Sequence, residues 1–259
     1  MEVLEGIISV RAAITAGNRE IEAVYVDGEK FRKRDRKITS FVSFLKANGI
    51  RAEFCERGVI DAFVKNSDEN AGNTHGGVCA AVGERKYMTV SQLLEKTAEE
   101  KGFLVYLDGV EDPFNLGYAV RALYAAGASG LVLPKRDRHI GAGVLARSSA
   151  GASELMCIAE FEGNDDKERR LSLIKEIKSY GITLACAAVS EKSVPLFEYN
   201  SGFPVILFIG GEKRGISPEF VDNADCITHI PYASPSVRYS LPTATVAAIT
   251  AFELMRLKG

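Results

Sequence analysis

Three loops of this sequence carry residues that could contact a ligand or support chemistry. The first loop spans residues 108–117 and holds Asn115, and Arg121 follows six residues later on the helix expected there. An amide side chain can orient a polar ligand, and a guanidinium can bind a phosphate through two parallel hydrogen bonds. The same pair also fits a helix whose N-cap is Asn115 and whose surface carries an arginine. The loop alone does not decide between these alternatives.

The second loop, residues 210–218, is a glycine-rich turn between an apolar strand and a helix expected to begin near Pro218. Such a turn is typical of a loop that contacts a nucleotide. Glu212 lies inside it and argues against a phosphate ligand, favouring a ribose, an amine or a cationic partner instead. A tight strand-to-helix turn with no ligand is the alternative.

The third loop runs through residues 229–248 and leads into an apolar C-terminal helix. Its many small residues allow the backbone to approach a ligand or another chain closely. Packing of one helix on another requires the same residues, so this pattern alone is ambiguous.

The elements that position these loops alternate along the second half of the chain. Continuous apolar strands separated by helices predict a parallel sheet that is covered on both faces, and ligands of such sheets bind beyond the carboxyl ends of the strands. The strands are expected at 103–107, 130–133, 182–185 and 204–209, with helices at 116–126 and 167–180.

A smaller α/β unit is expected before this sheet. It has predicted strands at 21–26, 51–54 and 77–82 and a helix at 38–47, while residues 66–77 have a loop composition. The polar stretch 89–101 suits a connecting helix rather than a core helix. We therefore expect an N-terminal domain at 1–86, a linker helix at 87–101 and a larger domain at 102–259.

Composition places the chain among ordinary globular proteins. It is 46% hydrophobic and 25% charged, with a net charge of −2. We expect a cytoplasmic protein, because the N-terminus is acidic where a secretory signal would be basic and no stretch is long enough to cross a bilayer. Neither the five scattered cysteines nor the three distant histidines have metal-ligand spacing, so no metal is expected. The cysteines are interpreted as small buried apolar residues.

One basic run stands out against this near-neutral charge. Residues 30–37 read Lys-Phe-Arg-Lys-Arg-Asp-Arg-Lys. Such a run can neutralise phosphates, so it is a candidate RNA contact, with a solvated loop as the alternative. The candidate RNA-binding residues are Arg32, Lys33, Arg34 and Arg36.

The order and spacing of the three loops resemble the SpoU/TrmH family of RNA 2′-O-ribose methyltransferases, within the SPOUT superfamily. Residues 115–127 resemble its first motif, N-x-G-x-x-x-R, and residues 210–215 resemble its second, G-N-E-G-x-G. Residues 230–241 resemble the start of its third, I-P-M followed by S-L-N-V-S. The small-residue run 148–152 also matches, and the N-terminal unit looks like the RNA-binding domain that many members carry.

This resemblance implies a fold, a cofactor and partners. The fold would be an α/β parallel-sheet domain with a trefoil knot, joined to a small N-terminal α/β RNA-binding domain. The protein would be a homodimer that acts on RNA, with ribosomal RNA favoured over transfer RNA, and it would need no metal and no membrane. S-adenosylmethionine would be held by backbone groups of Gly210, Ile230, Ser240 and Leu241.

By motif position, the catalytic residues would be Arg121, Asn115, Glu212 and Ser240. A ribose hydroxyl is a very weak acid, and a guanidinium is a poor base. We therefore expect Arg121 to hold a phosphate of the target and to stabilise the developing alkoxide, while Asn115 orients the ribose. Glu212 would fix Arg121 or its own loop.

Three departures from the family pattern leave alternatives open. Pro242 stands where the third motif has Asn, Ala244 where it has Ser, and Gly211 where the second motif has Asn. Either the target contacts are rearranged in a subgroup or the activity is weakened, and a non-catalytic RNA-binding relative is the limiting case.

A dinucleotide-dependent oxidoreductase is the other alternative, because residues 141–146 fit G-x-G-x-x-A and Glu160 and Glu162 follow. That fingerprint must come directly after its strand, whereas residues 134–140 intervene here.

Overall fold

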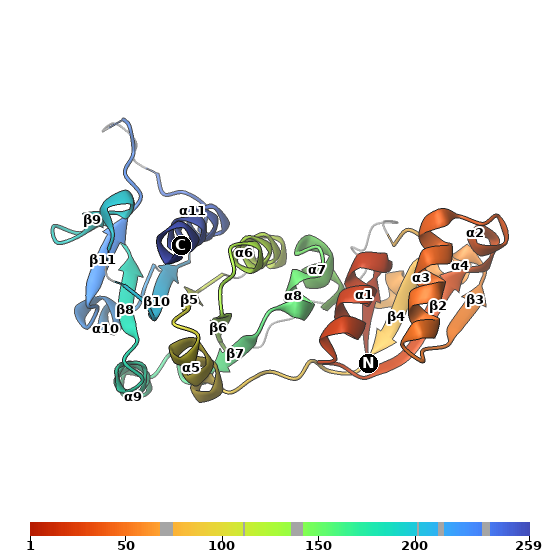
Figure 1. Cartoon of the computed structure of the whole chain (residues 1–259), viewed down its shortest axis with the longest axis horizontal. Helices are drawn as coiled ribbons and strands as arrows, with labels where there is room; N and C mark the ends of the chain where they lie inside the picture. The colour runs from red at the N-terminus through yellow and green to blue at the C-terminus, as the bar shows by residue number, and fades with distance from the viewer. Residues whose placement is uncertain (68–74, 111, 136–141, 201, 212–214, 235–238) are drawn as a thin grey trace. The chain divides into compact units, whose positions relative to one another are not determined.

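The computed structural model describes residues 1–67, 75–110, 112–135, 142–200, 202–211, 215–234 and 239–259 (Figure 1). The chain divides into two compact units. Unit 1 comprises residues 1–86 and 139–155, and unit 2 comprises residues 87–138 and 156–259. Each unit is described separately below.

Unit 1 is built on a four-stranded sheet with the order β1-β4-β2-β3, in which only β2 and β3 are parallel. Its elements are β1 (Glu2–Glu5), α1 (Gly6–Ala16), β2 (Ile21–Asp27), α2 (Gly28–Arg32), α3 (Arg36–Ala47), β3 (Ala52–Cys55), α4 (Arg57–Ser67), β4 (Val78–Val82), α7 (Ala142–Ser148) and α8 (Ala152–Leu155). The strands expected at 21–26, 51–54 and 77–82 and the helix at 38–47 are confirmed.

Helices cover both faces of this sheet. On one face, buried apolar side chains of α1, α3 and α7 pack against the strands. Val10, Phe41 and Ala146 are examples, one from each helix. On the other face Ile60 and Val64 of α4 pack with Cys79. Alternation of side chains along each strand sends successive residues to these two cores.

One buried and one partly buried ion pair attach α7 and α8 to the N-terminal part of unit 1. Arg19 Nε donates to Glu154 Oε2 at 2.7 Å, and these side chains are only 5% and 2% exposed. Arg147 Nη1 donates to both carboxylate oxygens of Glu5 at 2.9 Å. The segment 139–155, which the sequence analysis placed in the C-terminal domain, therefore shares a core with residues 1–86.

Gly143 shows why residues 141–146 resemble a dinucleotide fingerprint without serving as one. It lies in α7, and a Cβ added there would be 2.6 Å from the carbonyl oxygen of Val3 in β1. The glycine is required by close packing of a helix on a strand within unit 1.

Unit 2 contains a seven-stranded sheet with the order β7-β6-β5-β10-β8-β11-β9, and all its paired strands are parallel. Its elements are α5 (Val90–Glu99), β5 (Phe103–Asp108), α6 (Pro113–Ala125), β6 (Gly130–Pro134), β7 (Ile158–Phe161), α9 (Lys167–Ser179), β8 (Thr183–Ala187), β9 (Val194–Pro195), η1 (Leu196–Glu198), β10 (Val205–Gly210), α10 (Pro218–Asp222), β11 (Cys226–His229) and α11 (Thr243–Lys258). The expected α/β architecture with a covered parallel sheet is confirmed. The trefoil knot stays a prediction.

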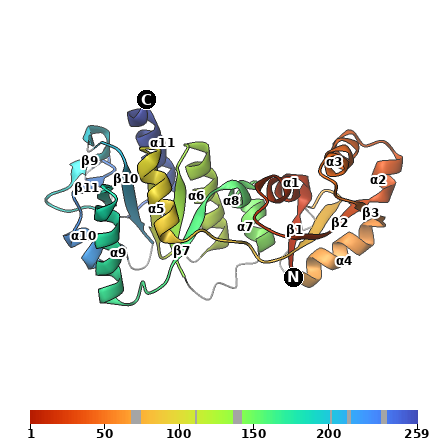
Figure 2. The same ribbon diagram turned by 60° about the horizontal axis from the view of Figure 1, so that its bottom comes forward.

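The helices of unit 2 form two layers, one on each face of the sheet (Figures 1 and 2). The helices α6 and α11 pack against each other on one face. On the opposite face, α5, α9 and α10 enclose an aromatic cluster in which the rings of Tyr106, Phe208 and Phe220 are in contact. In contrast to the expected connecting helix, α5 buries Leu93, Leu94 and Thr97 in this core.

Two further features bear on the class of protein. Burial raises the pKa of both the Cys79 and the Cys186 thiol to about 12, so both are protonated and behave as apolar core residues. In the part of the chain that the structure describes, no helix is both long and apolar enough to span a bilayer.

We predict that the Arg19–Glu154 pair is essential for the stability of unit 1. Arg19→Met should lower the free energy of unfolding by about 3–5 kcal/mol, because it leaves the Glu154 carboxylate buried without its partner. Lys33→Met is the matched control. Lys33 pairs with Glu29 at 2.6 Å, but these side chains are 73% and 65% exposed, so Lys33→Met should leave the free energy of unfolding almost unchanged. Equal denaturant midpoints for the two variants would contradict the prediction.

Candidate functional site

The loops with predicted ligand contacts follow neighbouring strands at one edge of the unit 2 sheet. β5 ends at Asp108 and β10 ends at Gly210, and these two residues are paired in register. β8 lies on the other side of β10, and β11 lies next to β8. Because all four strands are parallel, the segments after them meet at the carboxyl edge, as the sequence predicts.

Glycines allow the first two loops to touch through their backbones. A Cβ added to Gly211 would lie 2.4 Å from the carbonyl oxygen of Gly109, and one added to Gly210 would lie 2.4 Å from the carbonyl carbon of Gly215. No side chain fits at either position. The replacement of the usual motif Asn by Gly211 therefore has a steric cause in this protein.

A polar network beneath these loops is centred on Asp108, which is 5% exposed. Its carboxylate accepts from Asn164 Nδ2 at 2.9 Å and from Ser217 Oγ at 3.1 Å. Asn164 in turn accepts from the Tyr106 hydroxyl at 2.8 Å. The network ties the end of β5 to the end of the second loop, so Asp108 positions both.

The third loop joins this arrangement at the start of α11. Thr243, which is 3% exposed, donates its hydroxyl to the carbonyl oxygen of Gly210 at 3.2 Å. Pro242 is the N-cap residue of α11, and its carbonyl accepts from the amides of Thr245 and Val246. The amide of an N-cap residue takes part in no hydrogen bond within the helix, so proline loses none here. The φ angle that proline imposes also suits the extended backbone at this position. The structure offers no explanation for Ala244.

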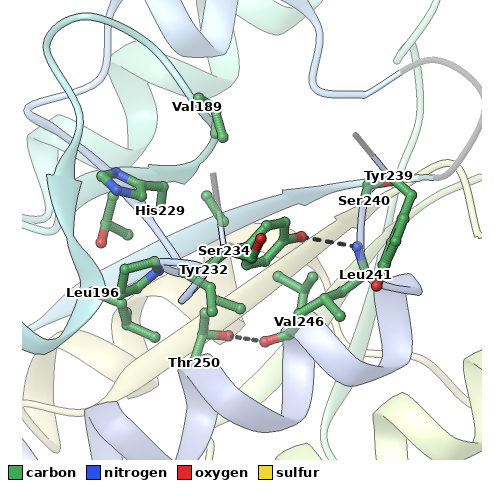
Figure 3. A pocket seen from close by; sticks show the side chains of 15 residues that line it. Val189, Leu196, His229, Tyr232, Ser234, Tyr239, Ser240, Leu241, Val246 and Thr250 are labelled. Atoms are coloured by element: carbon green, nitrogen blue, oxygen red, sulfur yellow. Dashed lines mark hydrogen bonds between the residues drawn. The ribbon is translucent and has the colours of Figure 1, made fainter. Parts of the chain in front are cut away.

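A cavity of about 650 Å³ opens beside these loops (Figure 3). Its walls come from the ends of β8 and β11, from η1, from the third loop and from the first turns of α11. The lining residues are Ala187, Ala188, Val189, Leu196, Thr228, His229, Ile230, Pro231, Tyr232, Ser234, Tyr239, Ser240, Leu241, Val246 and Thr250. Most of these side chains are apolar or aromatic.

Several polar side chains of the cavity are engaged with the protein itself. The Leu241 amide donates to the Tyr232 hydroxyl at 3.2 Å, and Thr250 donates its hydroxyl to the carbonyl of Val246 at 2.8 Å (Figure 3). His229 Nδ1 lies 2.9 Å from Ser193 Oγ. A ligand here would be recognised through shape, apolar contact and main-chain groups more than through charge.

The predicted cofactor residues fall in or next to this cavity. Ile230, Ser240 and Leu241 line it. Gly210 is not among the lining residues, but its carbonyl receives the hydroxyl of Thr243. Glu212 lies outside the described residues.

The structure places the remaining catalytic candidates on α6, away from the cavity lining. Asp112, not Asn115, is the N-cap, because its carboxylate accepts from the Asn115 amide at 2.8 Å and Pro113 occupies the first turn. Asn115 is half-buried. Arg121 is exposed, about two turns into the helix, and within the described part of the chain its guanidinium has no hydrogen-bond or ion-pair partner.

The candidate RNA-binding residues are all exposed on unit 1. Arg32, Arg34 and Arg36 line one surface depression together with Phe31 and the hydroxyl residues Thr39, Ser40 and Ser43. Lys33 is engaged by Glu29 instead.

Sequence analysis missed the contribution of residues 187–189 to the cavity. They follow β8 directly, and the rule that ligands bind beyond the carboxyl ends of strands could have identified them. Among the described residues no group of three or more His, Cys, Asp and Glu side chains is placed to hold a metal ion.

Two family models match the chain, and together they cover most of it. The model described as the SpoU rRNA methylase family matches residues 102–252, and the model described as RNA 2'-O ribose methyltransferase substrate binding matches residues 3–88.

Individual proteins show the same similarity. The 23S rRNA (guanosine-2'-O-)-methyltransferase of Yersinia pestis is 28% identical over all of this chain and 98% of its own length. An uncharacterized tRNA/rRNA methyltransferase of Synechocystis is 27% identical, and the chain spans 63% of that relative's length. The SpoU methyltransferase AviRb of Streptomyces viridochromogenes, solved with AdoMet, superposes with a TM-score of 0.74 at 20% identity over 99% of this chain and 89% of its own. That structural likeness concerns the fold.

We predict that Gly211→Ala disrupts the carboxyl edge. The new methyl group would overlap the backbone of Gly109, so the two loops must separate, and steric replacements of this kind typically cost about 1–3 kcal/mol. Gly58→Ala in α4 is the control, since nothing lies within 4 Å of its added Cβ. Thermal unfolding of both variants tests this, and a Gly211→Ala protein as stable as Gly58→Ala would show that the loops are not in close contact.

Proposed function

This chain belongs to the SpoU rRNA methylase family, and we propose that it transfers a methyl group from S-adenosylmethionine to a ribose 2′-hydroxyl of ribosomal RNA. The observation that carries this proposal is the cavity at the carboxyl edge of the sheet, which is built from the third family motif and lies beside the second. The match of residues 3–88 to a ribose methyltransferase substrate-binding model supports RNA as the substrate.

The cavity fits the cofactor in size and chemistry. Small-molecule sites have volumes of about 300–1,000 Å³ and mostly apolar walls with a few polar groups, and this cavity of about 650 Å³ agrees on both counts. Main-chain groups of Ile230, Ser240 and Leu241 would hold the adenosine, while Gly210 fixes the adjoining loop. The sulfonium of S-adenosylmethionine supplies an electrophilic methyl group to an oxygen nucleophile.

The chain itself must bind and orient the ribose. Arg121 is exposed and uncommitted among the described residues, so it is available to grip a phosphate of the target with two hydrogen bonds. Held there, its positive charge stabilises the alkoxide that develops as the hydroxyl proton leaves toward the substrate phosphate. Asn115 orients the ribose, Ser240 contributes at the cavity mouth, and Glu212 fixes Arg121 or the second loop.

The basic run of unit 1 would bind a part of the RNA other than the reacting ribose. Arg32, Arg34 and Arg36 present their charges around one depression, and Phe31 adds an aromatic wall for a base. Lys33 is part of the same run, although Glu29 partly neutralises it.

We further propose that the protein is a homodimer through α6 and α11 and that unit 2 carries the family's trefoil knot. Large apolar side chains stay exposed on these packed helices, notably Tyr118, Tyr124, Phe252 and Met255. Aromatic residues and methionine are enriched in protein interfaces, and closed two-fold dimers are the commonest assemblies.

We expect Arg121 to serve the reaction and not the fold. Arg121→Ala should leave the melting temperature and the S-adenosylmethionine affinity unchanged, while turnover falls by about a hundredfold or more. Arg121→Lys should recover little, because a point charge cannot reproduce a bidentate grip. Mapping of ribose methylation on bulk RNA should reveal a mark that is present with the wild-type gene and absent both without it and with Arg121→Ala.

Each outcome of that experiment has a clear meaning. An Arg121→Ala protein that unfolds would make Arg121 a structural residue. A stable variant with normal turnover would refute the assignment of the active site. Identical methylation maps with and without the gene would refute the proposed function.

The basic run should act through phosphate neutralisation. Replacing Arg32, Lys33, Arg34 and Arg36 together by Ala should weaken RNA binding and flatten its salt dependence by about 0.7–0.9 in slope per lost phosphate contact. S-adenosylmethionine affinity should not change. Lys175→Ala on α9 of unit 2 is the control for a general effect of charge. A salt slope equal to that of wild type would identify the run as a solvated surface.

The proposed dimer has a direct test. Light scattering on the full chain should give the mass of two protomers at micromolar concentration, and Phe252→Glu should shift it toward one by placing a charge in the interface. Val59→Glu, at a similarly exposed apolar position on α4 of unit 1, should leave the dimer intact. A monomer for the wild-type chain would exclude the proposed assembly.

A further inference from the structure

A second cavity lies within unit 1, separate from the cofactor cavity and outside the candidate residues named so far except Arg36. Its volume is about 720 Å³, and it is bounded by the first turns of α1 and α3, by the turn at His75 and Gly76, and by α7. Four cationic side chains line it: Lys30, Arg36, Lys37 and Arg147.

The two carboxylates in this cavity are already engaged. Glu5 accepts two hydrogen bonds from Arg147 at 2.9 Å. Asp35 caps α3 by accepting from the Ile38 amide at 3.0 Å. Lys30 is oriented by its hydrogen bond to the Gly76 carbonyl at 2.8 Å. Arg36 and Lys37 have no hydrogen-bond or ion-pair partner within the described residues. The cavity therefore has an excess of positive charge.

The helix termini add to this charge. The eleven-residue helix α1 has neither a side-chain cap nor an acidic residue in its first turn. In α3 the first turn carries Arg36 and Lys37, at the end where the helix macrodipole disfavours cations. The N-terminus of α1 thus faces a cavity that is already cationic, and the Asp35 cap of α3 is flanked by two cations. Local rules broken in this way are expected at functional sites.

Ser9 supplies an independent sign of a ligand. It lines the cavity and is only 3% exposed, and its hydroxyl has no hydrogen-bond partner among the residues that the structure describes. The hydroxyl oxygen is accessible from the cavity, so it can donate to a ligand there. An anion with several acceptor oxygens, held among these cations, would accept its proton.

We propose that this cavity binds a backbone phosphate of the RNA substrate. Lys30, Arg36 and Lys37 neutralise the phosphate while Arg147 stays paired with Glu5 at the cavity wall. Ser9 and the first-turn amides of α1 donate hydrogen bonds to it. The inference rests on the proposed function for the identity of the substrate. Arg36 also lines the depression of the basic run, so the cavity extends that RNA-binding surface to a second contact.

The test uses the full chain and a fluorescein-labelled RNA hairpin, titrated over a range of KCl concentrations. Lys37→Ala should reduce the slope of the salt dependence by about 0.7–0.9, corresponding to one lost phosphate contact. Lys46→Ala is the matched control, since Lys46 is an exposed lysine in the last turn of the same helix and its removal should leave the slope unchanged. Equal slopes for Lys37→Ala and wild type would overturn the proposal.

A second pair of variants isolates the charge inside the cavity. Ser9→Asp and Ser9→Asn have nearly the same shape, but only the aspartate repels a phosphate. An acidic residue near the start of a helix also favours folding. Ser9→Asp should bind the hairpin about tenfold or more weakly than Ser9→Asn, with both proteins folded by thermal melting. Equal affinities would count against the site.

Failure of this inference differs from failure of the proposed function. S-adenosylmethionine titration and methyl transfer by the wild-type chain test the function alone. If the wild type neither binds the cofactor nor methylates RNA, while Lys37→Ala still lowers the salt slope, the cavity remains a phosphate site in an RNA-binding protein of another activity.

Discussion

Two stretches of backbone meet at the carboxyl edge of β5 and β10 with no space for a side chain between them. A Cβ on Gly211 would lie 2.4 Å from the carbonyl oxygen of Gly109. The pairing of Asp108 with Gly210 determines which residues of the two loops meet in this contact. The Asp108 carboxylate also accepts a hydrogen bond from Ser217 at the far end of the second loop. Because Thr243 donates to the carbonyl of Gly210, the same contact also determines where α11 begins. The cavity walls that come from α11 and the third loop therefore depend on this close backbone contact, which only glycine permits.

Unit 1 depends on a different constraint, the burial of charge. Between β6 and β7 the chain leaves the sheet of unit 2, and α7 and α8 are held in unit 1 by the Arg147–Glu5 and Arg19–Glu154 pairs. Removing one partner of a buried pair is far more costly than the pair is worth. An N-terminal fragment cut at residue 86 would leave Arg19 and Glu5 without these partners and would lose Ala146 from its core. The range matched by the substrate-binding model therefore lacks part of the core of unit 1. Arg147, which lines the cationic cavity, belongs to the segment outside that range.

The sequence predicted the elements whose pattern is strong and local. β5 and β10 are buried on both faces, so they read as continuous apolar runs. Short strands such as β11, and α4 with Gly58 in its first turn, carry weak local signals and were missed. The helix α5 was taken for a connector because only a narrow stripe of it is apolar, yet Leu93 and Leu94 are fully buried. Ile230, Ser240 and Leu241, which line the cavity, came only from the resemblance to the third family motif. Residues 187–189 were missed because a wall made of small apolar residues after a strand has no distinctive composition.

The departures from the family motifs bear on whether the site is active or only a remnant. Gly211 fits the close contact with Gly109, and the amide side chain usual there has no room. Pro242 sits at the N-cap of α11, where its missing amide removes no helical hydrogen bond and its carbonyl still caps the helix. Both changes therefore belong to one consistent local geometry in which the second and third loops pack closely. The second and third loops are joined by the hydrogen bond from Thr243 to Gly210, and the Leu241 amide donates to Tyr232 within the third loop. Because Gly211 and Pro242 are both accommodated by this packing, the geometry favours a rearranged site over a decayed one.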